Sequence, residues 1–289
     1  MKVPKALTIA GSDTSGGAGL QADIKTFQEF GVYGMTAITV IVAQNPANNW
    51  AHDIYPLSLE ALEAQINTVL GGIGVDAMKT GMLGTVEIIS LVARKLDEYQ
   101  VKNIVIDPVM ICKGTDEVLH PESAIAISQQ LAPRATIITP NVFEASQLSG
   151  VRIQSVDTMK EAAVKIYALG SKYVLIKGGA KLGTDKATDL LYDGKEFTLF
   201  ETPKINTDYT HGAGCTYAAA ITAGLAQGLP VPDAVAQAKK FVTQAIQHGF
   251  PINSYVGPTY HAAHRLAKVY RQALHLGRFS GERCFLPQD

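Results

Sequence analysis

Short apolar runs alternate with longer segments of helical periodicity along most of this chain, and no other feature constrains the fold as strongly. The strand-like runs end in polar or glycine-rich turns and fall at residues 5–10, 35–42, 75–79, 103–107, 136–139 and 173–177. Helix-like segments lie at residues 20–30, 58–70, 85–99, 123–131, 143–148 and 156–169. Because parallel strands need long crossover connections, the alternation predicts a mostly parallel sheet covered on both faces by helices. We therefore expect an α/β fold, a three-layer α/β/α sandwich.

The C-terminal third departs from strict alternation. An Asp193-Gly194 pair between two alternating runs predicts a β-hairpin near residues 190–199. A long helix is predicted over residues 232–247. Because no repeat, low-complexity segment or linker divides the sequence, we expect residues 1–289 to form one domain. Residues 265–289 are predicted to begin as a basic helix and to end irregularly around Cys284, with no assigned role.

Composition narrows the classes of function. Hydrophobic residues make up 47% of the 289 and charged residues 18%, a globular balance that supports a sizeable core. The net charge of −1 gives no electrostatic basis for binding nucleic acid or an anionic membrane. No apolar stretch approaches the roughly 20 residues that span a bilayer. Three widely spaced cysteines do not form a disulfide framework, so we expect a soluble, cytoplasmic protein.

A turn of small residues at 211–216, His-Gly-Ala-Gly-Cys-Thr, precedes an Ala-rich segment that favours helix. Small residues at a helix start leave backbone N–H groups open, and the helix dipole adds partial positive charge, so the turn suits an anion. We expect the same field to lower the pKa of Cys215 below the ordinary thiol value of about 8.5. The alternative is a tight helix start with a small cysteine that packs as a hydrophobe.

Polar and acidic residues gather at the predicted carboxyl ends of the strands, where parallel sheets bind their ligands. Asp107, Glu144 and Lys177 stand among them, the lysine directly before a Gly-Gly turn. Any one of them is explained as the polar end of a strand. Together with the amide-lined turn they match the needs of nucleotide phosphates and a divalent cation. The set therefore favours phosphoryl transfer, which requires mainly alignment and charge neutralisation.

A second glycine-rich turn, at residues 14–19, resembles two nucleotide motifs without satisfying either. A P-loop needs Lys and then Ser or Thr where Gly17 and Ala18 stand. Residues 17–22 fit a relaxed dinucleotide fingerprint, but the next strand ends in Ala-Gln-Asn at 43–45 and not in the acid that a ribose needs. We therefore give a dinucleotide site little weight.

Nine motifs together identify a known family. They lie at residues 11–19, 21–26, 43–45, 79–83, 107–110, 139–145, 177–179, 210–216 and 256–261. In combination they resemble the ribokinase-fold vitamin kinases, in the branch of hydroxymethylpyrimidine phosphate kinase. The resemblance covers about residues 5–261. Cys112 is typical of the dual-cysteine pyridoxal kinases of this branch, whereas Ala213 stands where threonine is commoner.

The resemblance implies a ribokinase-like kinase that uses ATP and Mg²⁺. It implies Cys215 as the base that takes the proton of the substrate hydroxymethyl group, with the amides of Gly212, Ala213 and Gly214 around the transferred phosphoryl group. Asp107 and Glu144 are expected to organise Mg²⁺, and His211 to support the turn. The residues expected near ATP are Thr139, Asn141, Lys177, Gly178, Gly179, Ala180, Thr188, Ala213 and Lys239. Those expected around the substrate ring are Ser12, Asp23, Gln44, Met82 and Cys112.

Cys112 separates the favoured substrate from its nearest rival. The resemblance implies that its thiol lies on a flap and adds to the pyridoxal aldehyde as a reversible hemithioacetal, which a pyrimidine alcohol cannot form. We therefore expect a pyridoxal kinase that also accepts hydroxymethylpyrimidine, and relatives imply a homodimer. The nearest alternative is a hydroxymethylpyrimidine (phosphate) kinase of thiamin biosynthesis. More remote alternatives are an acyl-transfer enzyme using Cys215 with His211, and a vitamer-binding protein without catalysis.

Overall fold

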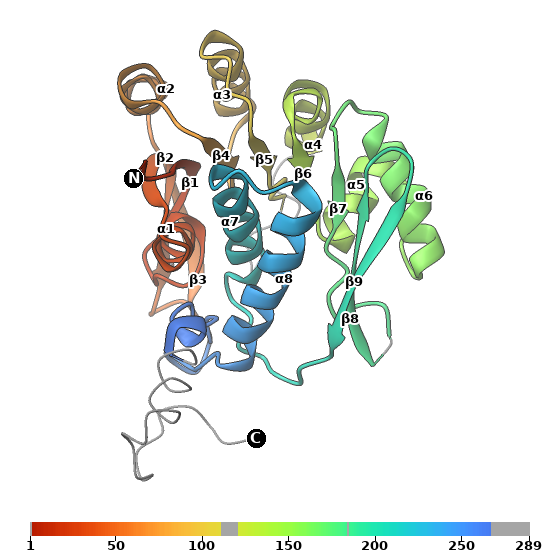
Figure 1. The fold of residues 1–289 in the computed structure, drawn as a ribbon. Coiled ribbons are helices and arrows are strands. Elements are labelled where there is room, and N and C mark those ends of the chain that lie inside the picture. Colours follow the sequence, from red (N-terminus) through yellow and green to blue (C-terminus); the bar gives the residue numbers. More distant parts are fainter. Residues whose placement is uncertain (1, 111–120, 184, 267–289) are drawn as a thin grey trace.

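A single mixed sheet runs through the computed structural model, which describes residues 2–110, 121–183 and 185–266 (Figure 1). Within these residues the strand order is β3-β2-β1-β4-β5-β6-β7-β8-β9. The strands are β1 (Lys5–Asp13), β2 (Tyr33–Asn45), β3 (Ala51–Pro56), β4 (Ala77–Thr80), β5 (Ile104–Ile106), β6 (Ile137–Ile138), β7 (Val174–Ile176), β8 (Lys186–Tyr192) and β9 (Phe197–Pro203). Neighbours from β2 to β7 are parallel, whereas β3 at one edge and the β8–β9 hairpin at the other are antiparallel.

Helices cover both faces of this sheet, which confirms the predicted three-layer α/β architecture. One face carries α2 (Leu59–Ile66), α3 (Val86–Glu98), α4 (Pro121–Ala126), α5 (Val142–Ser149) and α6 (Val156–Tyr167), and the other carries α1 (Gly19–Glu29), α7 (Ala213–Ala226) and α8 (Val231–Gln247) (Figure 1). Successive strand residues belong to different cores: Met78 packs with the first group of helices and Ala77 with the second. Both residues are apolar, as a strand covered on both faces requires.

Helix α7 lies between α1 and α8 on its face of the sheet and is buried along nearly its whole length (Figure 1). Its small side chains permit this close packing. A Cβ added at Gly224 would lie 2.9 Å from Cβ of Ala234 on α8. The first turn of α7 therefore meets the carboxyl ends of the central strands, where the functional residues were expected.

Two elements differ from the sequence-based expectation. Strand β2 continues to Asn45 and folds back as β3, a strand whose residues show no clear apolar alternation and which pairs only with β2. The helix expected over residues 58–70 ends at Ile66 and continues as a π-helical segment, Asn67–Ile73. Gly71 and Gly72 lie in that segment, and consecutive glycines disfavour a regular α-helix.

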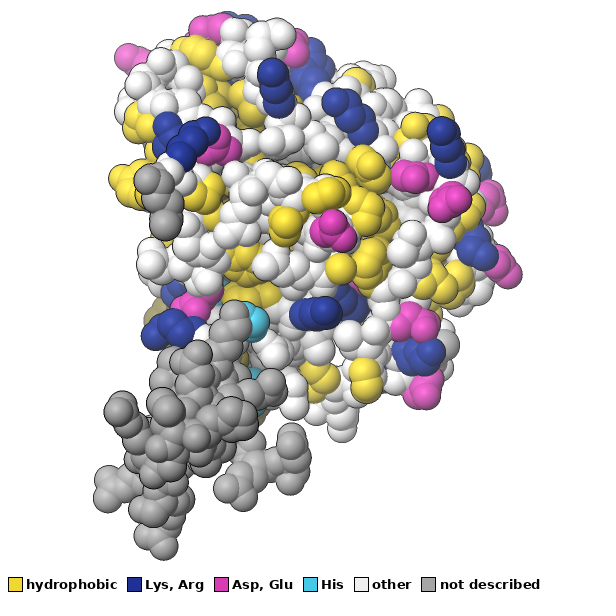
Figure 2. Space-filling view, in the orientation of Figure 1, with side chains coloured by type: hydrophobic (Ala, Val, Ile, Leu, Met, Phe, Trp, Pro, Cys, Tyr) yellow, Lys and Arg dark blue, Asp and Glu magenta, His cyan; other side chains and the backbone are white. Residues whose placement is uncertain are grey.

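Charged side chains are distributed over the surface without a single dominant sign. On the face shown in Figure 2, basic and acidic residues are interspersed, and hydrophobic side chains gather toward its middle. None of the described helices is long and apolar enough to cross a bilayer.

Candidate active site

A cavity of about 660 Å³ opens at the carboxyl ends of the parallel strands. Of the residues predicted for the site, those lining it are Gln44, Met82, Asp107, Asn141, Glu144, Lys177, Gly178, Gly179, Ala180, Gly212, Ala213, Gly214, Cys215 and Lys239. Residues far apart in the sequence thus converge here, as the position of their strands predicts. Ser12, Asp23, Thr139 and Thr188 do not line the cavity. Cys112 and Cys284 lie outside the described residues.

The turn before α7 depends on glycine. Gly212 is the N-cap of α7 and has a φ of 77°, in the left-handed region that favours glycine. A Cβ added there would lie 1.9 Å from the carbonyl oxygen of Gly17, so no other residue fits without displacing the first glycine-rich turn. The two glycine-rich turns are therefore packed against each other. Gly212 to Cys215 line the cavity, but the N–H of Ala213 is engaged within the turn, where it donates to the carbonyl of Thr210 at 3.1 Å.

Burial reverses the shift that was expected for Cys215. The residue lies deep among protein atoms although part of its surface is accessible. Burial raises its pKa to about 12, the charge of Asp23 adds to this effect, and the charge of Lys79 opposes it. The prediction of a lowered pKa is therefore wrong for the ligand-free protein. Loss of solvent around the thiolate outweighs the Lys79 charge and the Gly19 backbone hydrogen bond, which both favour the thiolate.

Asp107, Glu144 and Lys177 form a charged cluster in the same cavity. The Lys177 Nζ lies 2.7 Å from Oδ1 of Asp107, and Asp107 is 3% exposed. Glu144 is also buried, and its Oε2 accepts a 2.8 Å hydrogen bond from the N–H of Asn141. Burial raises the pKa of Glu144 to about 7, Lys177 opposes the rise and the charge of Asp107 adds to it. Two buried carboxylates that repel each other are a suitable place for a cation.

The described residues contain no group of three or more His, Cys, Asp or Glu side chains arranged to hold a metal ion. Mg²⁺ bound for phosphate chemistry does not require such a group. In such sites the ion is commonly held by one or two carboxylates, with the substrate phosphates and water completing its coordination. Asp107 and Glu144 supply that number of carboxylates, so the residues present fit the ion.

Around the expected nucleotide site, Asp189 joins two cavity-lining segments. Its Oδ1 accepts a 3.1 Å hydrogen bond from the N–H of Gly179, and its Oδ2 lies 2.6 Å from Nζ of Lys239. Lys239 is therefore paired within the protein. Thr188, also expected near ATP, is buried and donates its hydroxyl to Glu201 at 3.2 Å. Its nearest link to the cavity is its backbone N–H, which donates to the carbonyl of Gly179.

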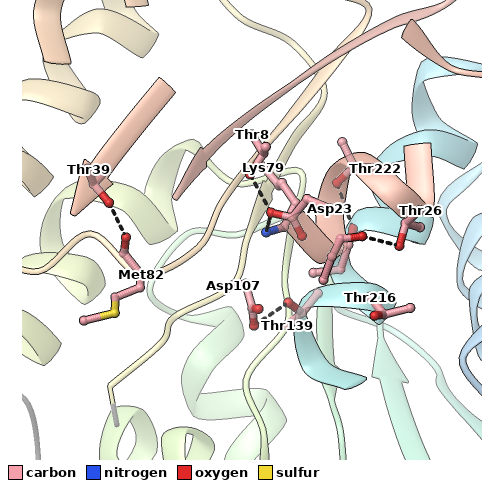
Figure 3. A network of polar contacts seen from close by, with 12 residues as sticks. Thr8, Asp23, Thr26, Thr39, Lys79, Met82, Asp107, Thr139, Thr216 and Thr222 are labelled. Atoms are coloured by element: carbon pink, nitrogen blue, oxygen red, sulfur yellow. Dashed lines mark hydrogen bonds and ion pairs between the residues drawn. The ribbon is translucent and has the colours of Figure 1, made fainter. Parts of the chain in front are cut away.

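Asp23, expected around the substrate ring, lies instead in the interior. It is 0% exposed, its Oδ2 lies 2.8 Å from Nζ of the equally buried Lys79, and it accepts a 2.6 Å hydrogen bond from Thr8. Figure 3 shows this ion pair, with Asp107 and Thr139 nearby. Thr139 donates to Oδ1 of Asp107 at 3.3 Å. Each of the two residues thus contacts a residue that lines the cavity, Asp23 contacting Lys79 and Thr139 contacting Asp107.

His211 has its partner in Asp13. Its Nε2 lies 2.8 Å from Oδ2 of Asp13, and its backbone N–H donates to the carbonyl of Gly257. This agrees with a supporting role for His211. It gives no support to a Cys215–His211 acyl-transfer pair, because that nitrogen is already engaged.

Sequence reasoning missed several residues of the cavity. Asp13, His52, Asp189 and Tyr217 all line it. Asp13 was part of a recognised motif but received no role. His52 lies on β3, where it pairs with Gln44 of β2. Because β3 was not predicted, His52 was not recognised either. Asp189 and Tyr217 lie inside a strand and a helix, where nothing in the sequence distinguishes them from ordinary structural residues.

Comparison with known proteins agrees with this geometry. The sequence pattern of the phosphomethylpyrimidine kinase family matches residues 13–260. A pyridoxine kinase from Bacillus subtilis (strain 168) is 60% identical over 267 residues, which cover 92% of this chain and 98% of the relative. A hydroxymethylpyrimidine/phosphomethylpyrimidine kinase from the same strain is 48% identical over 263 residues, 91% of this chain and 96% of the relative.

A solved structure shows the same architecture. The pyridoxal kinase from Staphylococcus aureus in complex with AMP-PCP and pyridoxal superposes with a TM-score of 0.86 at 47% identity, and the match covers 92% of this chain and 96% of that one. The fold is thus that of the ribokinase-like vitamin kinases. The chain belongs to the phosphomethylpyrimidine kinase family, which confirms the resemblance found in the sequence.

Proposed function

We propose that this protein transfers the γ-phosphoryl group of ATP to the hydroxymethyl group of pyridoxal, and that it also accepts hydroxymethylpyrimidine. The observation that carries the proposal is one cavity that contains both the Cys215 turn and the Asp107–Glu144–Lys177 cluster. The names of the relatives support it, because they include a pyridoxine kinase at 60% identity and a pyridoxal kinase solved with both substrate types.

In the proposed reaction the thiolate form of Cys215 accepts the proton of the substrate hydroxymethyl group. The substrate oxygen forms a bond to the γ-phosphorus, the bond to the β-phosphate oxygen breaks, and ADP leaves. The amides of Gly212, Gly214 and Cys215 stabilise charge on the group in transfer, whereas the amide of Ala213 donates to the carbonyl of Thr210. A thiol with a pKa of about 12 is protonated at neutral pH. Burial is the main cause of this high pKa, and the charges of Asp23 and Asp107 add to it, so neutralising Asp107 within the loaded site shifts the equilibrium toward the thiolate.

Asp107 and Glu144 would hold Mg²⁺, which when bound neutralises phosphate charge and aligns the leaving group. Lys177, which lies beside them, would contact the phosphates. Asn141, Gly178, Gly179, Ala180 and Ala213 would surround the nucleotide. Lys239 and Thr188 would support that region through Asp189 and Gly179 without touching phosphate.

The vitamer ring would lie against Gln44 and Met82, with Ser12 behind them. Cys112, which is outside the described residues, would add its thiol across the pyridoxal C=O bond, with sulfur bonding to carbon and the proton passing to oxygen. Pyridoxine, which is an alcohol, cannot take this step. We also propose that the protein is a single domain, that it acts in the cytoplasm and that it forms a homodimer. Light scattering of the purified protein tests the dimer.

A substrate panel tests the proposed function. Purified protein is incubated with ATP, Mg²⁺ and pyridoxal, pyridoxine or hydroxymethylpyrimidine, and the phosphorylated products are quantified by mass spectrometry. We expect phosphorylated pyridoxal, and we expect Cys112→Ala to slow that reaction more than the reaction of pyridoxine. Phosphorylation of the pyrimidine alone would favour the alternative, a pyrimidine kinase like the relative at 48% identity. No phosphorylation of any vitamer would refute the proposal.

A further inference from the structure

Residues 257–261, which follow α8, are hydrogen-bonded to both ends of the turn that begins α7. At the first end, the N–H of His211 donates to the carbonyl of Gly257 at 3.1 Å, and the N–H of Thr259 donates to the carbonyl of His211 at 3.1 Å. These two bonds form an isolated parallel β-bridge. The segment therefore holds the backbone of the turn where the chain enters it.

At the other end, a side chain of the same segment contacts α7. Nε2 of His261 lies 2.8 Å from Oγ1 of Thr216, the residue after Cys215. Thr216 is 0% exposed and His261 is 6% exposed, so water is not at hand to replace either partner. Burial, with a smaller contribution from the charge of Lys25, lowers the pKa of His261 to about 4. The contact is therefore a hydrogen bond between a neutral imidazole and a hydroxyl.

The hydroxyl of Thr216 is used differently from that of Thr222 on the same helix, and Figure 3 shows both side chains. Thr222 is also 0% exposed, and its hydroxyl donates to the carbonyl of Ala218, four residues earlier, at 2.8 Å. Such a bond keeps a threonine hydroxyl within its own helix. The Thr216 hydroxyl instead connects the first turn of α7 to the segment after α8.

The first turn of α7 has little restraint of its own. The helix begins at Gly212 without a side-chain cap. Gly212 and Gly214 have the backbone freedom of glycine, which makes an ordered conformation more costly to maintain. A catalytic group must nevertheless be held within about 0.5 Å of its productive position. The turn therefore needs support from outside the helix, and residues 257–261 supply it at both ends.

We propose that His261 is a positioning residue, which holds the first turn of α7 through the Thr216 hydroxyl and so keeps Cys215 aligned with the substrate hydroxymethyl group. This inference rests on the proposed function. Neither His261 nor Thr216 lines the cavity, so the pair acts through the turn and touches neither substrate nor nucleotide. A displacement of about 1 Å at the reacting atoms can cost about a hundredfold in rate.

Two substitutions of Thr216 test the contact from the side of α7. Thr216→Val keeps the shape of the side chain and deletes the hydroxyl, whereas Thr216→Ser keeps the hydroxyl. With pyridoxine and ATP, we expect kcat to fall at least about tenfold in Thr216→Val and to stay within about threefold of the wild type in Thr216→Ser. The KM for pyridoxine should stay within about threefold in both, because ring contacts are unchanged.

Thr222→Val is the matched control. It deletes an equally buried hydroxyl from the same helix, but one that bonds only within that helix. Its kcat should stay within about threefold of the wild type, so a general effect of removing a buried hydroxyl from α7 is separated from loss of the His261 contact.

Substitutions of His261 test the positioning residue itself. The amide of His261→Gln can still bond to a hydroxyl, whereas His261→Leu cannot. We expect kcat within about fivefold of the wild type for His261→Gln, and a loss at least about tenfold for His261→Leu. Combining His261→Leu with Thr216→Val should cost no more than about threefold beyond the worse single variant, because both changes delete the same contact.

Alkylation of Cys215 gives a readout that does not depend on turnover. The chain has three cysteines, so Cys112→Ala with Cys284→Ala leaves Cys215 as the only thiol. In that background we expect iodoacetamide to react at least about fivefold faster when His261→Leu is added, because a loosened turn exposes the buried sulfur. Addition of Thr222→Val should leave the rate within about twofold.

A wild-type kcat in His261→Leu, with ADP affinity intact, would overturn the inference. Equal losses of kcat in Thr216→Val and Thr222→Val would also overturn it. If Thr216→Val does not fold, the comparison of His261→Gln with His261→Leu decides. If the wild type phosphorylates no vitamer, the proposed function fails, and the alkylation rates still show whether His261 holds the turn.

Discussion

Gly212 has a φ of 77° and a neighbouring carbonyl, that of Gly17, only 1.9 Å from where a Cβ would stand. We predict that Gly212→Ala lowers the free energy of unfolding by at least about 3 kcal/mol and abolishes phosphotransfer, because strain and a backbone clash act together. Gly228→Ala is the matched control. Gly228 has a φ of 87° with nothing within 4 Å of its added Cβ, so only the conformational cost of about 1 kcal/mol applies. Urea unfolding and the kinase assay measure both variants, and equal losses of stability would contradict this view.

Glu144 is expected to destabilise the ligand-free protein at neutral pH. Between its ordinary pKa of 4.5 and its folded pKa of about 7, the folded protein keeps a proton that the unfolded chain has released. The free energy of unfolding of the wild type therefore falls as the pH rises through this window. Gln carries no such proton but retains an acceptor for the N–H of Asn141.

We predict that Glu144→Gln gains about 3 kcal/mol of stability relative to the wild type between pH 4.5 and pH 8, while losing most of its kinase activity. Urea unfolding across that range measures the gain. A difference in stability that does not change with pH would show that Glu144 is not buried as described.

The sequence predicted where individual site residues lie in the fold, but not how deeply they are buried. The positions of Asp107, Glu144, Lys177 and Cys215 at strand ends and a helix start follow from local patterns, and they converge as expected. The degree of burial does not follow from such patterns. Burial removes solvent from the Cys215 thiol, and it gives Asp23 an internal partner in Lys79 instead of a place beside the ring.

At the scale of elements, two helices begin with the same reciprocal cap but differ in position. Asn141 of α5 and Ser155 of α6 each accept a hydrogen bond from the third residue of their helix in a capping box. Only Asn141 lines the cavity. We predict that Asn141→Ala and Ser155→Ala each cost about 1 kcal/mol of stability, and that only Asn141→Ala impairs turnover with ATP. Thermal melting and the KM for ATP test the pair. An equal effect of both variants on that KM would count against a nucleotide role for Asn141.

The elements themselves were predictable to different degrees. The central strands and amphipathic helices followed from their periodicity, and the β8–β9 hairpin from its Asp193-Gly194 turn. Strand β3 was not predictable, because its backbone is specified by pairing with β2 at the sheet edge and not by its own apolar pattern. Because β3 was not predicted, His52 was not recognised as a residue that lines the cavity.

At the scale of the whole molecule, the sheet brings residues that are distant in the sequence together in one site. The Asp13–His211 pair joins residues 198 positions apart and holds the two glycine-rich turns together. Gln44 lies at the end of β2, the charged cluster follows β5, β6 and β7, and Cys215 lies in the first turn of α7. In the proposed function, the ring would bind at the β2 end of this cavity and the phosphates at the end that holds the charged cluster.

The central claim, that the Cys215 thiol is the base of a phosphotransfer, is tested most directly by the Cys215→Ala variant. Pyridoxine and ATP are supplied to the variant and the wild type, and pyridoxine phosphate is quantified over time, with ADP affinity measured by calorimetry to show an intact fold. We predict that product formation falls at least about a hundredfold while ADP affinity stays within about twofold. Product formation at the wild-type rate in a folded variant would contradict the account.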